Sequence, residues 1–252
     1  MLEIRNLTAG YTDELVLNEI SASFEKGKVT SLIGLNGSGK STLLRALLGI
    51  LPRTAGDVNI DGISIDSLSR TEIARRVAYL AQGKNTPDMT VMQMVLHGRF
   101  PHLSYPRSYG KADREIALAA IERVGLKNHV NTPLLHLSGG MRQNAYIAMA
   151  LAQSTDYILL DEPTTYLDLP HQVDLMRLIR SLADSGKGII TVMHDLPLAF
   201  DFSDKIILVD SGEIIAADRP HVISKMPVIR EKFGAEICYD EKSGHYTRHY
   251  RK

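Results

Sequence analysis

The sequence has no tryptophan, a single cysteine and no excess of charge of either sign. Its 252 residues include 29 basic and 29 acidic side chains, so electrostatic attraction to nucleic acid or to an anionic membrane is not expected. Cys238 has no partner for an internal disulfide, which fits a reducing compartment. The sequence has no uncharged apolar run of membrane-spanning length, and its N-terminus lacks the basic and apolar segments of a signal peptide. We therefore expect a soluble, cytosolic protein that meets a membrane only through a partner.

Short β-type segments alternate with helical segments along the chain, which predicts an α/β fold. The apolar runs S-L-I-G, Y-I-L-L-D and I-I-T-V-M are continuous, as expected of parallel strands covered on both faces. The first 25 residues and residues 58–65 instead predict antiparallel pairing, with turn chemistry in G-D-V-N-I-D-G. Between 82 and 137 the strand signals vanish, and helices are predicted over 90–97 and 111–124. The expected strands are Leu2–Leu7, Ile20–Phe24, Val29–Gly34, Val58–Ile60, Val77–Ala81, Tyr157–Asp161, Gly188–Met193, Lys205–Val209 and Glu213–Ala217. A small hairpin or a frayed tail is expected at the C-terminus.

A phosphate-binding loop is predicted at Gly34–Thr42, which reads G-L-N-G-S-G-K-S-T. It follows an apolar strand and precedes the helical run T-L-L-R-A-L-L, the context that this pattern requires. Backbone N–H groups are expected to surround a β-phosphate, while Lys40 reaches the β and γ oxygens and Ser41 binds Mg²⁺. The expected nucleotide contacts in the loop are Asn36, Gly37, Ser38, Gly39, Lys40, Ser41 and Thr42.

A second anion-binding position is predicted at Leu137–Gln143, L-S-G-G-M-R-Q. A helix begins near Gly139, so its free N–H groups and the positive end of its dipole would face an anion. Two glycines would let a polyphosphate approach the backbone closely. The chain therefore carries two phosphate-binding segments that lie far apart in sequence.

Two acids end the apolar strand Y-I-L-L-D-E-P, at the sheet edge where ligands of open α/β sheets bind. Asp161 suits Mg²⁺ binding through a water, and Glu162 suits polarisation of an attacking water. The alternative is a strand that simply ends in solvated acids, but the phosphate-binding loop favours catalysis. The expected reaction is in-line attack of water on a γ-phosphate, with charge stabilisation as the main catalytic effect.

Together, in this order, these motifs resemble the ATP-binding subunit of an ABC (ATP-binding cassette) transporter, from about Leu2 to Ile223. The resemblance implies a P-loop NTPase fold with a RecA-like core, a mainly parallel sheet, an antiparallel β subdomain and an inserted helical subdomain. It implies one ABC ATPase domain over 1–225, divided into a core with the β subdomain at 1–87 and 156–225 and a helical subdomain at 88–155, with a short C-terminal extension at 226–252.

The resemblance also assigns roles by position. Gly34–Thr42 corresponds to Walker A, Leu137–Gln143 to the signature motif and Tyr157–Glu162 to Walker B. The implied catalytic residues are Lys40, Gln82, Glu162 and His194, and the implied Mg²⁺ ligands are Ser41, Gln82 and Asp161. Further nucleotide contacts are implied for Tyr11, which would stack on adenine, for Ser138, Gly139 and Gly140 of the signature, and for Asp168 of the D-loop. From the residues alone, Tyr11 could equally be a packing residue and Gln82 an ordinary loop residue.

In this family two copies pack head to tail, and each ATP lies between the Walker A loop of one copy and the signature helix of the other. Ser138 and Gly140 would thus act in trans, and ATP binding would join two halves that hydrolysis releases. The sequence departs from the family pattern at Leu35, where proline is common, and at Met141 and Asn144, where charged residues are common.

Two strings are similar to those of importers for iron–siderophores, haem and vitamin B12: G-R-F-P-H at 98–102 and T-Y-L-D-L-P-H-Q at 165–172. The likeness implies a second copy of the chain, a membrane permease docking near 82–105, and a periplasmic or extracellular substrate-binding protein acting indirectly. It places the protein at the cytoplasmic face of the inner membrane in a bacterium or archaeon, without a role for nucleic acid. A soluble ABC ATPase of translation or DNA repair, and an importer ATPase for another substrate, stay open as alternatives.

Overall fold

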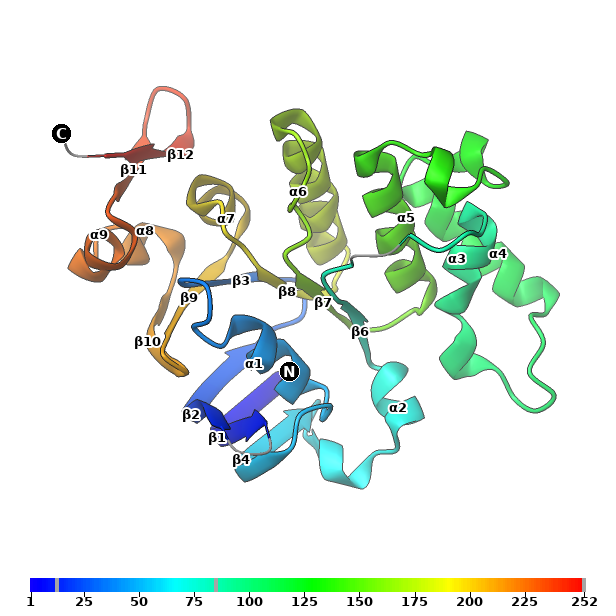
Figure 1. Ribbon diagram of the computed structural model, residues 1–252, viewed down its shortest axis with the longest axis horizontal. Helices are drawn as coiled ribbons and strands as arrows, with labels where there is room; N and C mark the ends of the chain where they lie inside the picture. The colour runs from blue at the N-terminus through cyan, green and yellow to red at the C-terminus, as the bar shows by residue number, and fades with distance from the viewer. Residues whose placement is uncertain (12–13, 84–85, 251–252) are drawn as a thin grey trace.

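A six-stranded, mainly parallel sheet forms the centre of the computed structural model, which describes residues 1–11, 14–83 and 86–250 (Figure 1). Only β10 runs antiparallel to its neighbour. Strands β3, β7 and β8 are buried along their whole length because helices cover both faces, which explains their unbroken apolar sequences. The strand order is β10-β9-β3-β8-β7-β6, and the bounds are β3 Val29–Ile33, β6 Val77–Leu80, β7 Tyr157–Asp161, β8 Gly188–Val192, β9 Lys205–Asp210 and β10 Glu213–Asp218.

An antiparallel sheet of order β2-β1-β4-β5 packs beside the central sheet, with α1 (Lys40–Leu47) between the two. Its strands are β1 Leu2–Tyr11, β2 Glu14–Phe24, β4 Arg53–Ile60 and β5 Ile63–Ser64. The expectation of antiparallel pairing is confirmed, but β1, β2 and β4 are longer than predicted. Register shifts interrupt β1 after Ile4, and such bulges break the alternating pattern that reveals a strand in a sequence.

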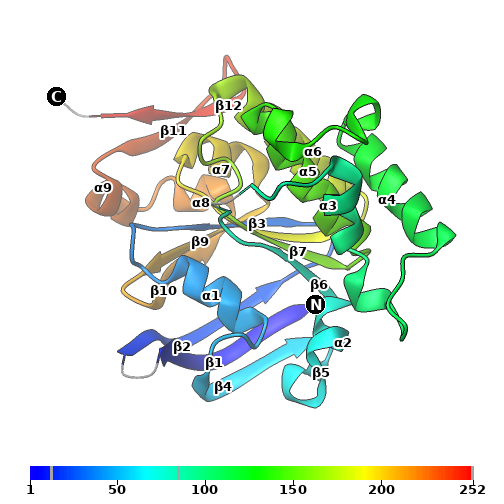
Figure 2. The same ribbon diagram turned by 45° about the vertical axis from the view of Figure 1, so that its right-hand side comes forward.

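Three helices form a lobe beside β6 and β7, at the edge of the central sheet that β6 forms (Figure 2). They are α3 Val91–His97, α4 Lys111–Arg123 and α5 Gly139–Ala152, and they confirm the predicted helices to within about one residue at each end. Thr90 and Gln93 form a reciprocal capping box that starts α3. Ser138 caps α5 by accepting a hydrogen bond of 3.2 Å from the backbone N–H of Met141.

Two side chains of the string G-R-F-P-H at 98–102 form hydrogen bonds that connect the helices of this lobe. Arg99 is buried, and its guanidinium donates to Asp113 Oδ1 at 3.0 Å and to the carbonyl of Ala152 at 2.8 Å. The His102 ring lies 2.9 Å from the carbonyl oxygen of Gln153 through Nε2. Both polar residues of the string therefore join the end of α3 to the end of α5, and Phe100 between them is about half exposed.

The remaining helices cover the central sheet and its outer edge: α2 Arg70–Ala74, α6 Leu169–Asp184, α7 Leu196–Phe202, α8 Pro220–Ile223 and α9 Pro227–Phe233. Short 3₁₀ turns occur at Ile65–Ser67, Phe100–His102, Lys127–His129 and Leu134–His136. Helices α8 and α9 were not predicted; the four residues of α8 are too few to show helical periodicity.

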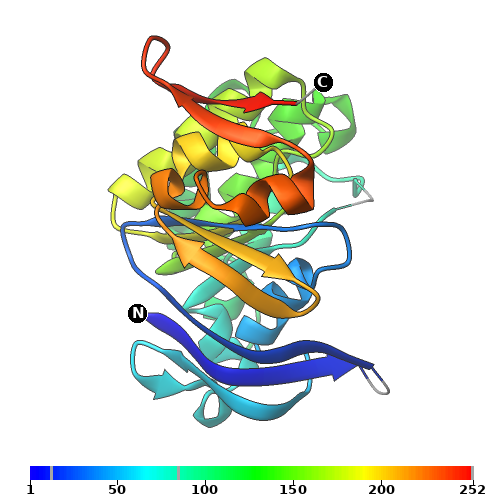
Figure 3. The same ribbon diagram turned by 90° about the vertical axis from the view of Figure 1, so that its left-hand side faces the viewer.

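The C-terminus ends in a hairpin, β11 Glu236–Asp240 and β12 His245–His249, which lies on the opposite side of the β9–β10 pair from β1 and β2 (Figure 3). The Tyr246 ring packs edge-on against Phe200 of α7 at 5.4 Å and against Tyr239 at 5.2 Å between centroids. Asp201 of α7 accepts a 2.7 Å hydrogen bond from the backbone N–H of Tyr246. The sequence predicted either a small hairpin or a frayed tail here, and the structure contains the hairpin.

Asp61 joins the antiparallel sheet to the central sheet. Its carboxylate accepts hydrogen bonds from the N-terminal ammonium at 2.5 Å and from the Tyr157 hydroxyl at 3.0 Å, and it pairs with Lys26 at 3.0 Å. Burial by itself would raise the pKa of Asp61, but these three donors together lower that pKa to about 2. The folded pKa thus lies below the ordinary value of 3.8. Asp61 therefore stabilises the fold above about pH 4, and this contribution is lost as the pH falls towards 2.

We expect Asp61→Asn to lower the free energy of unfolding at pH 7 by about 1–2 kcal/mol, since its partly exposed partners are screened by solvent. Urea unfolding at pH values from 7 to 3 measures the effect. The difference in unfolding free energy between Asp61→Asn and the wild-type chain should become smaller below pH 4. The matched control is Asp57→Asn, an exposed position on β4 that should change stability by less than about 0.5 kcal/mol. If the difference in unfolding free energy between the two chains did not change with pH, the ionised carboxylate of Asp61 would not be its cause.

Candidate active site

The loop Gly34–Thr42 connects β3 to α1 and wraps the ammonium of Lys40. A Cβ at Gly34 would lie 2.2 Å from the carbonyl oxygen of Val209, so only glycine fits this close approach. Lys40 Nζ is buried and donates to the carbonyls of Gly34 at 2.9 Å and Leu35 at 2.7 Å. Burial lowers the pKa of Lys40, and the nearby carboxylates oppose that shift. The loop therefore presents a cation held by neutral carbonyls, which a phosphate oxygen can replace as its partner.

An oxygen-rich pair lies at the start of α1. Ser41 Oγ donates to Asp161 Oδ1 at 2.7 Å, and Tyr79 Oη donates to Asp161 Oδ2 at 3.1 Å. Burial, followed by the charge of Asp161, raises the pKa of Tyr79 to about 12, so this hydroxyl is a donor at neutral pH. Tyr79 was not predicted as a site residue, because its contact with Asp161 depends on β6 pairing with β7, which the local sequence does not reveal.

Glu162 is the meeting point of three loops that follow adjacent parallel strands. Gln82 Nε2, after β6, donates to Glu162 Oε2 at 2.7 Å, and Thr165 Oγ1 donates to the same oxygen at 3.2 Å. His194 Nε2, after β8, lies 2.6 Å from Glu162 Oε1. The backbone of Glu162 is left-handed, with φ of 53°, a strained conformation for a residue with a side chain. Such strain concentrates at functional sites, and here it turns the carboxylate towards Gln82 and His194.

The Walker A loop and the residues that converge on Glu162 line one cleft of about 590 Å³. Of the predicted residues, the cleft is lined by Asn36, Gly37, Gly39, Lys40, Ser41, Thr42, Gln82, Glu162 and His194. Its lining also includes Val16, Thr165 and Tyr166, which the sequence analysis did not single out. Within the described part of the chain, the predicted residues that do not line this cleft are Tyr11, Ser38, Ser138, Gly139, Gly140, Asp161 and Asp168.

The residues outside the cleft have other surroundings. Tyr11 is half exposed, and its hydroxyl accepts a 2.8 Å hydrogen bond from Arg45. Gly139 lines a neighbouring hollow of about 450 Å³ together with Gln82 and Glu162. Asp168 is exposed and bonded to His171. Gly139 thus adjoins the site of its own chain, whereas Ser138 and Gly140 do not line the cleft that the Walker A loop forms.

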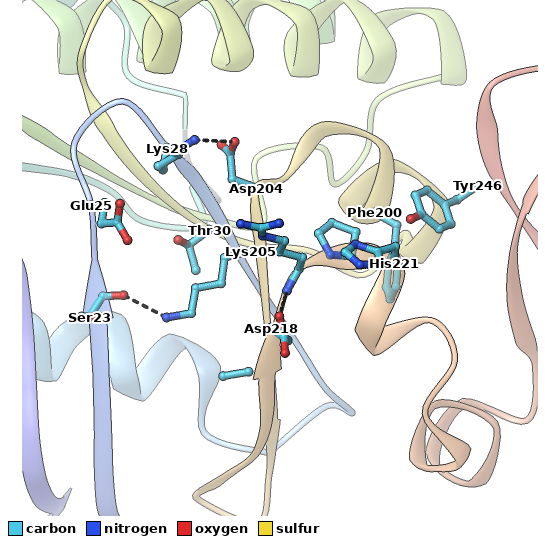
Figure 4. Close-up of a pocket in the computed structure, with 13 residues that line it drawn as sticks. Ser23, Glu25, Lys28, Thr30, Phe200, Asp204, Lys205, Asp218, His221 and Tyr246 are labelled. Carbon is cyan, nitrogen blue, oxygen red and sulfur yellow. Dashed lines mark hydrogen bonds and ion pairs between the residues drawn. The ribbon is translucent and has the colours of Figure 1, made fainter.

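A separate cleft of about 720 Å³ lies against β9, β10 and α8, away from these residues (Figure 4). Two of its lysines contact protein groups: Lys28 pairs with Asp204 at 3.3 Å, and Lys205 donates to the carbonyl of Ser23 at 3.3 Å. A carbonyl does not neutralise the charge of Lys205, but none of the residues predicted for the site lines this cleft, so the active-site candidate is the cleft around Lys40 and Glu162.

The profile of the family described as ABC transporter matches residues 17–165, more than half of the chain. The chain belongs to the ABC transporter family. It binds ATP and is an ATPase, as the family membership and the P-loop fold establish. The predicted fold class and the predicted resemblance are thereby confirmed. Among the described residues, no helix has both the length and the apolar character that crossing a membrane requires.

Several curated members of the family resemble the ABC ATPase over nearly its whole length. The petrobactin import ATP-binding protein FpuD of Bacillus anthracis is 39% identical, with 93% of this chain and 87% of the relative aligned. The iron(3+)-hydroxamate import ATP-binding protein FhuC of Bacillus subtilis is 39% identical, with coverage of 96% and 91%. The ferric enterobactin transport ATP-binding protein FepC of Escherichia coli is 39% identical, with coverage of 90% and 85%.

Solved structures share the fold of the ABC ATPase. A metal-chelate-type ABC transporter in an inward-facing conformation superposes with a TM-score of 0.85 at 25% identity, covering 99% of this chain and 98% of the other. The cassette MJ0796, in a dimeric post-hydrolysis state with ADP and phosphate, gives a TM-score of 0.75 at 28% identity, covering 87% and 99%.

Proposed function

We propose that this chain is the ATP-hydrolysing subunit of an importer that takes up iron–siderophore, haem or cobalamin-type substrates through a separate membrane permease. The observation that carries the hydrolytic part is the convergence of Gln82, Thr165 and His194 on the Glu162 carboxylate. The import part is supported by the relatives named above, which serve the import of petrobactin and iron–hydroxamate and the transport of ferric enterobactin.

In the proposed mechanism Glu162 accepts a proton from the water that attacks the γ-phosphate. Gln82 and His194, each bonded to one of its oxygens, orient the carboxylate and the water. Lys40 and the backbone N–H groups of residues 37–41 hold the β- and γ-phosphates, and the exposed ring of Tyr11 stacks on adenine. Lys40 provides positive charge close to the β-phosphate of the departing ADP, where negative charge develops during the reaction.

Mg²⁺ fits the donor set at the start of α1. Ser41 Oγ and the Asp161 carboxylate are already in contact, and Gln82 donates through its nitrogen to Glu162, which leaves its amide oxygen as an acceptor. Hydroxyl, carboxylate and amide oxygens are the ligand types that Mg²⁺ prefers. When bound, the ion would supply charge neutralisation at the β- and γ-phosphates.

The complete site requires a second copy of the chain. Ser138, Gly139 and Gly140 would bind the nucleotide held by the partner's Walker A loop, and Asp168 would steady that opposing site. The proposal is supported by the position of Ser138, Gly140 and Asp168 outside the cleft of their own chain. A helix N-terminus capped by Ser138 and open at Gly139, where an added Cβ would meet no atom of the described residues within 4 Å, suits a γ-phosphate brought by another molecule.

We also propose that the domain division stated above applies, with the core and β subdomain at 1–87 and 156–225, the helical subdomain at 88–155 and the extension at 226–252. The permease would dock near 82–105, at the cytoplasmic face of a bacterial or archaeal membrane. Tyr105 is 96% exposed in this segment, and the guanidinium of Arg107 lies 4.5 Å from the centre of the half-exposed Phe100 ring. Positions 84 and 85 lie outside the described residues. A substrate-binding protein would act through the permease alone.

Affinity purification from detergent-solubilised membranes of the source cells tests the import proposal. We expect a polytopic membrane protein to co-purify, and Tyr105→Ala to weaken that association while ATP hydrolysis by the isolated chain is kept. Tyr250→Ala is the matched control, an exposed tyrosine on the C-terminal side of β12.

Uptake of labelled ferric siderophores, haem and cobalamin by cells lacking the gene then identifies the cargo. Loss of uptake of one of these substrates is the expected result. Co-purification with ribosomes or DNA, and no membrane partner, would instead indicate a soluble ABC ATPase. A membrane partner without any defect for these three classes would indicate an importer of another substrate.

A further inference from the structure

Asp168 and His171 lie in the first turn of α6, and their side chains are joined. His171 Nδ1 is hydrogen-bonded to Asp168 Oδ1. Asp168 occupies the N-cap position of α6, where an aspartate ordinarily accepts a hydrogen bond from the helix backbone, but its side chain makes no such bond. The imidazole therefore holds the Asp168 carboxylate in a rotamer that the helix alone would not select.

The other side of the His171 ring contacts the signature helix of the same chain. A Cβ built on Gly140 would lie 2.6 Å from His171 Cδ2 and 3.0 Å from Cγ, so the ring packs directly on the Gly140 α-carbon. Both residues line a small cavity of about 220 Å³ between α5 and α6, helices that run side by side in Figure 1. Gly140 thus has a steric reason to be glycine, independent of any phosphate: a methyl group there would displace His171.

Gln172, the next residue, holds the D-loop backbone. Its Nε2 donates to the carbonyl of Leu167 at 2.9 Å and reaches that of Thr164 at 3.4 Å. The H-Q pair that follows the D-loop in the sequence therefore has two separate tasks. Gln172 fixes the main chain of the loop, and His171 connects its terminal carboxylate to the signature helix.

We propose that His171 is a positioning residue that fixes the D-loop to the signature helix within one chain. The inference rests on the proposed function, in which both segments serve the ATP site of the partner copy. Asp168 belongs to the core and Gly140 to the helical lobe, so the imidazole spans the boundary between two parts that must present their groups together. Loss of the ring frees Asp168 and lets α5 shift relative to α6. The ATP-bound dimer is weakened, while the Walker A cleft of the same chain is untouched.

ATP-driven dimerisation in a Glu162→Gln background tests this role, because hydrolysis does not interfere there. Analytical ultracentrifugation gives the ATP concentration at half-dimerisation, and a fluorescent ATP analogue measures nucleotide binding by the dilute monomer. We expect His171→Ala to raise the half-dimerisation concentration about fivefold, because the dimer loses this solvent-exposed contact in both of its copies. Monomer binding should change less than about twofold. The control is His221→Ala, an exposed histidine in α8.

Two further variants separate a positioning role from general damage. His171→Asn keeps an N–H donor close to the position of Nδ1 and should restore dimerisation to within about 1.5-fold of the background. Gly140→Ala should weaken dimerisation when His171 is present, and by a smaller factor when His171 is already alanine, because the ring no longer obstructs the methyl group.

The outcomes distinguish this inference from the function on which it rests. If the Glu162→Gln chain does not dimerise with ATP at all, both are overturned. If it dimerises and His171→Ala does so at the same ATP concentration, only the role of His171 is overturned. Equal losses in His171→Ala and His171→Asn, or an equal loss of monomer binding, also contradict it.

Discussion

Replacing Glu162 by glutamine is expected to lower the rate of ATP hydrolysis by roughly 10²–10⁴-fold, the usual contribution of a general base. The amide has nearly the shape of the carboxylate, but it cannot take the proton of an attacking water. ATP binding should be kept, because the phosphate contacts proposed for Lys40 and its loop do not depend on Glu162. The bound but unhydrolysed ATP should then hold two copies together as a stable dimer.

Steady-state phosphate release and size-exclusion chromatography with ATP measure the two effects. Glu115→Gln on the exposed face of α4 is the matched control, since its carboxylate is exposed and lies 3.8 Å from the ammonium of Lys111. That variant should hydrolyse ATP at the rate of the unmodified chain. If Glu162→Gln hydrolysed ATP at the rate of the unmodified chain, Glu162 would not be the general base, even though it contacts Gln82 and His194.

Replacing Ser138 by arginine is expected to lower hydrolysis at least about 10²-fold while the isolated chain still binds nucleotide. The long cation would occupy the N-terminus of α5, where the positive end of the helix dipole already disfavours it, and would block the partner's phosphates. The change also removes a helix cap. Ser69→Arg is therefore the matched control, because Ser69 caps α2 in the same way and lies away from the cleft.

Mixing two inactive chains gives a complementary result. In a dimer of Lys40→Ala with Ser138→Arg, one composite site keeps both an intact Walker A loop and an intact signature. Random pairing makes half of the dimers mixed, and half of their sites are intact, so about a quarter of the sites should recover. No recovery on mixing, together with dimers that still form, would indicate that Ser138 serves its own chain.

The sequence predicted best the segments whose chemistry is local. Gly34–Thr42 and Tyr157–Asp161 were placed correctly, because a glycine-rich turn between a strand and a helix, and an unbroken apolar strand, depend on near neighbours. That Gln82, Glu162 and His194 lie together depends on β6, β7 and β8 being adjacent and parallel. Only the resemblance to a family implied that arrangement.

Residues whose roles depend on tertiary contacts escaped the sequence analysis. Tyr79 looks like an ordinary strand residue until β6 pairs with β7, and Thr165 is one of two successive threonines until its hydroxyl meets Glu162. Arg99 carries a charge, which usually indicates a surface position. It is nevertheless buried, because hydrogen bonds to Asp113 and to the carbonyl at the end of α5 satisfy its guanidinium. Long-range pairing, which no local pattern encodes, decides each of these cases.

The central claim is that one ATP site is built from two chains, and disulfide cross-linking tests it most directly. Cys238 is the chain's one cysteine, so a Cys238→Ser background allows two single-cysteine chains with different tags, Asn36→Cys and Ser138→Cys. In the Glu162→Gln background we predict a disulfide between the two different chains, formed with ATP and absent without it. A single chain carrying both cysteines that links them internally, with no link between chains, would contradict the account.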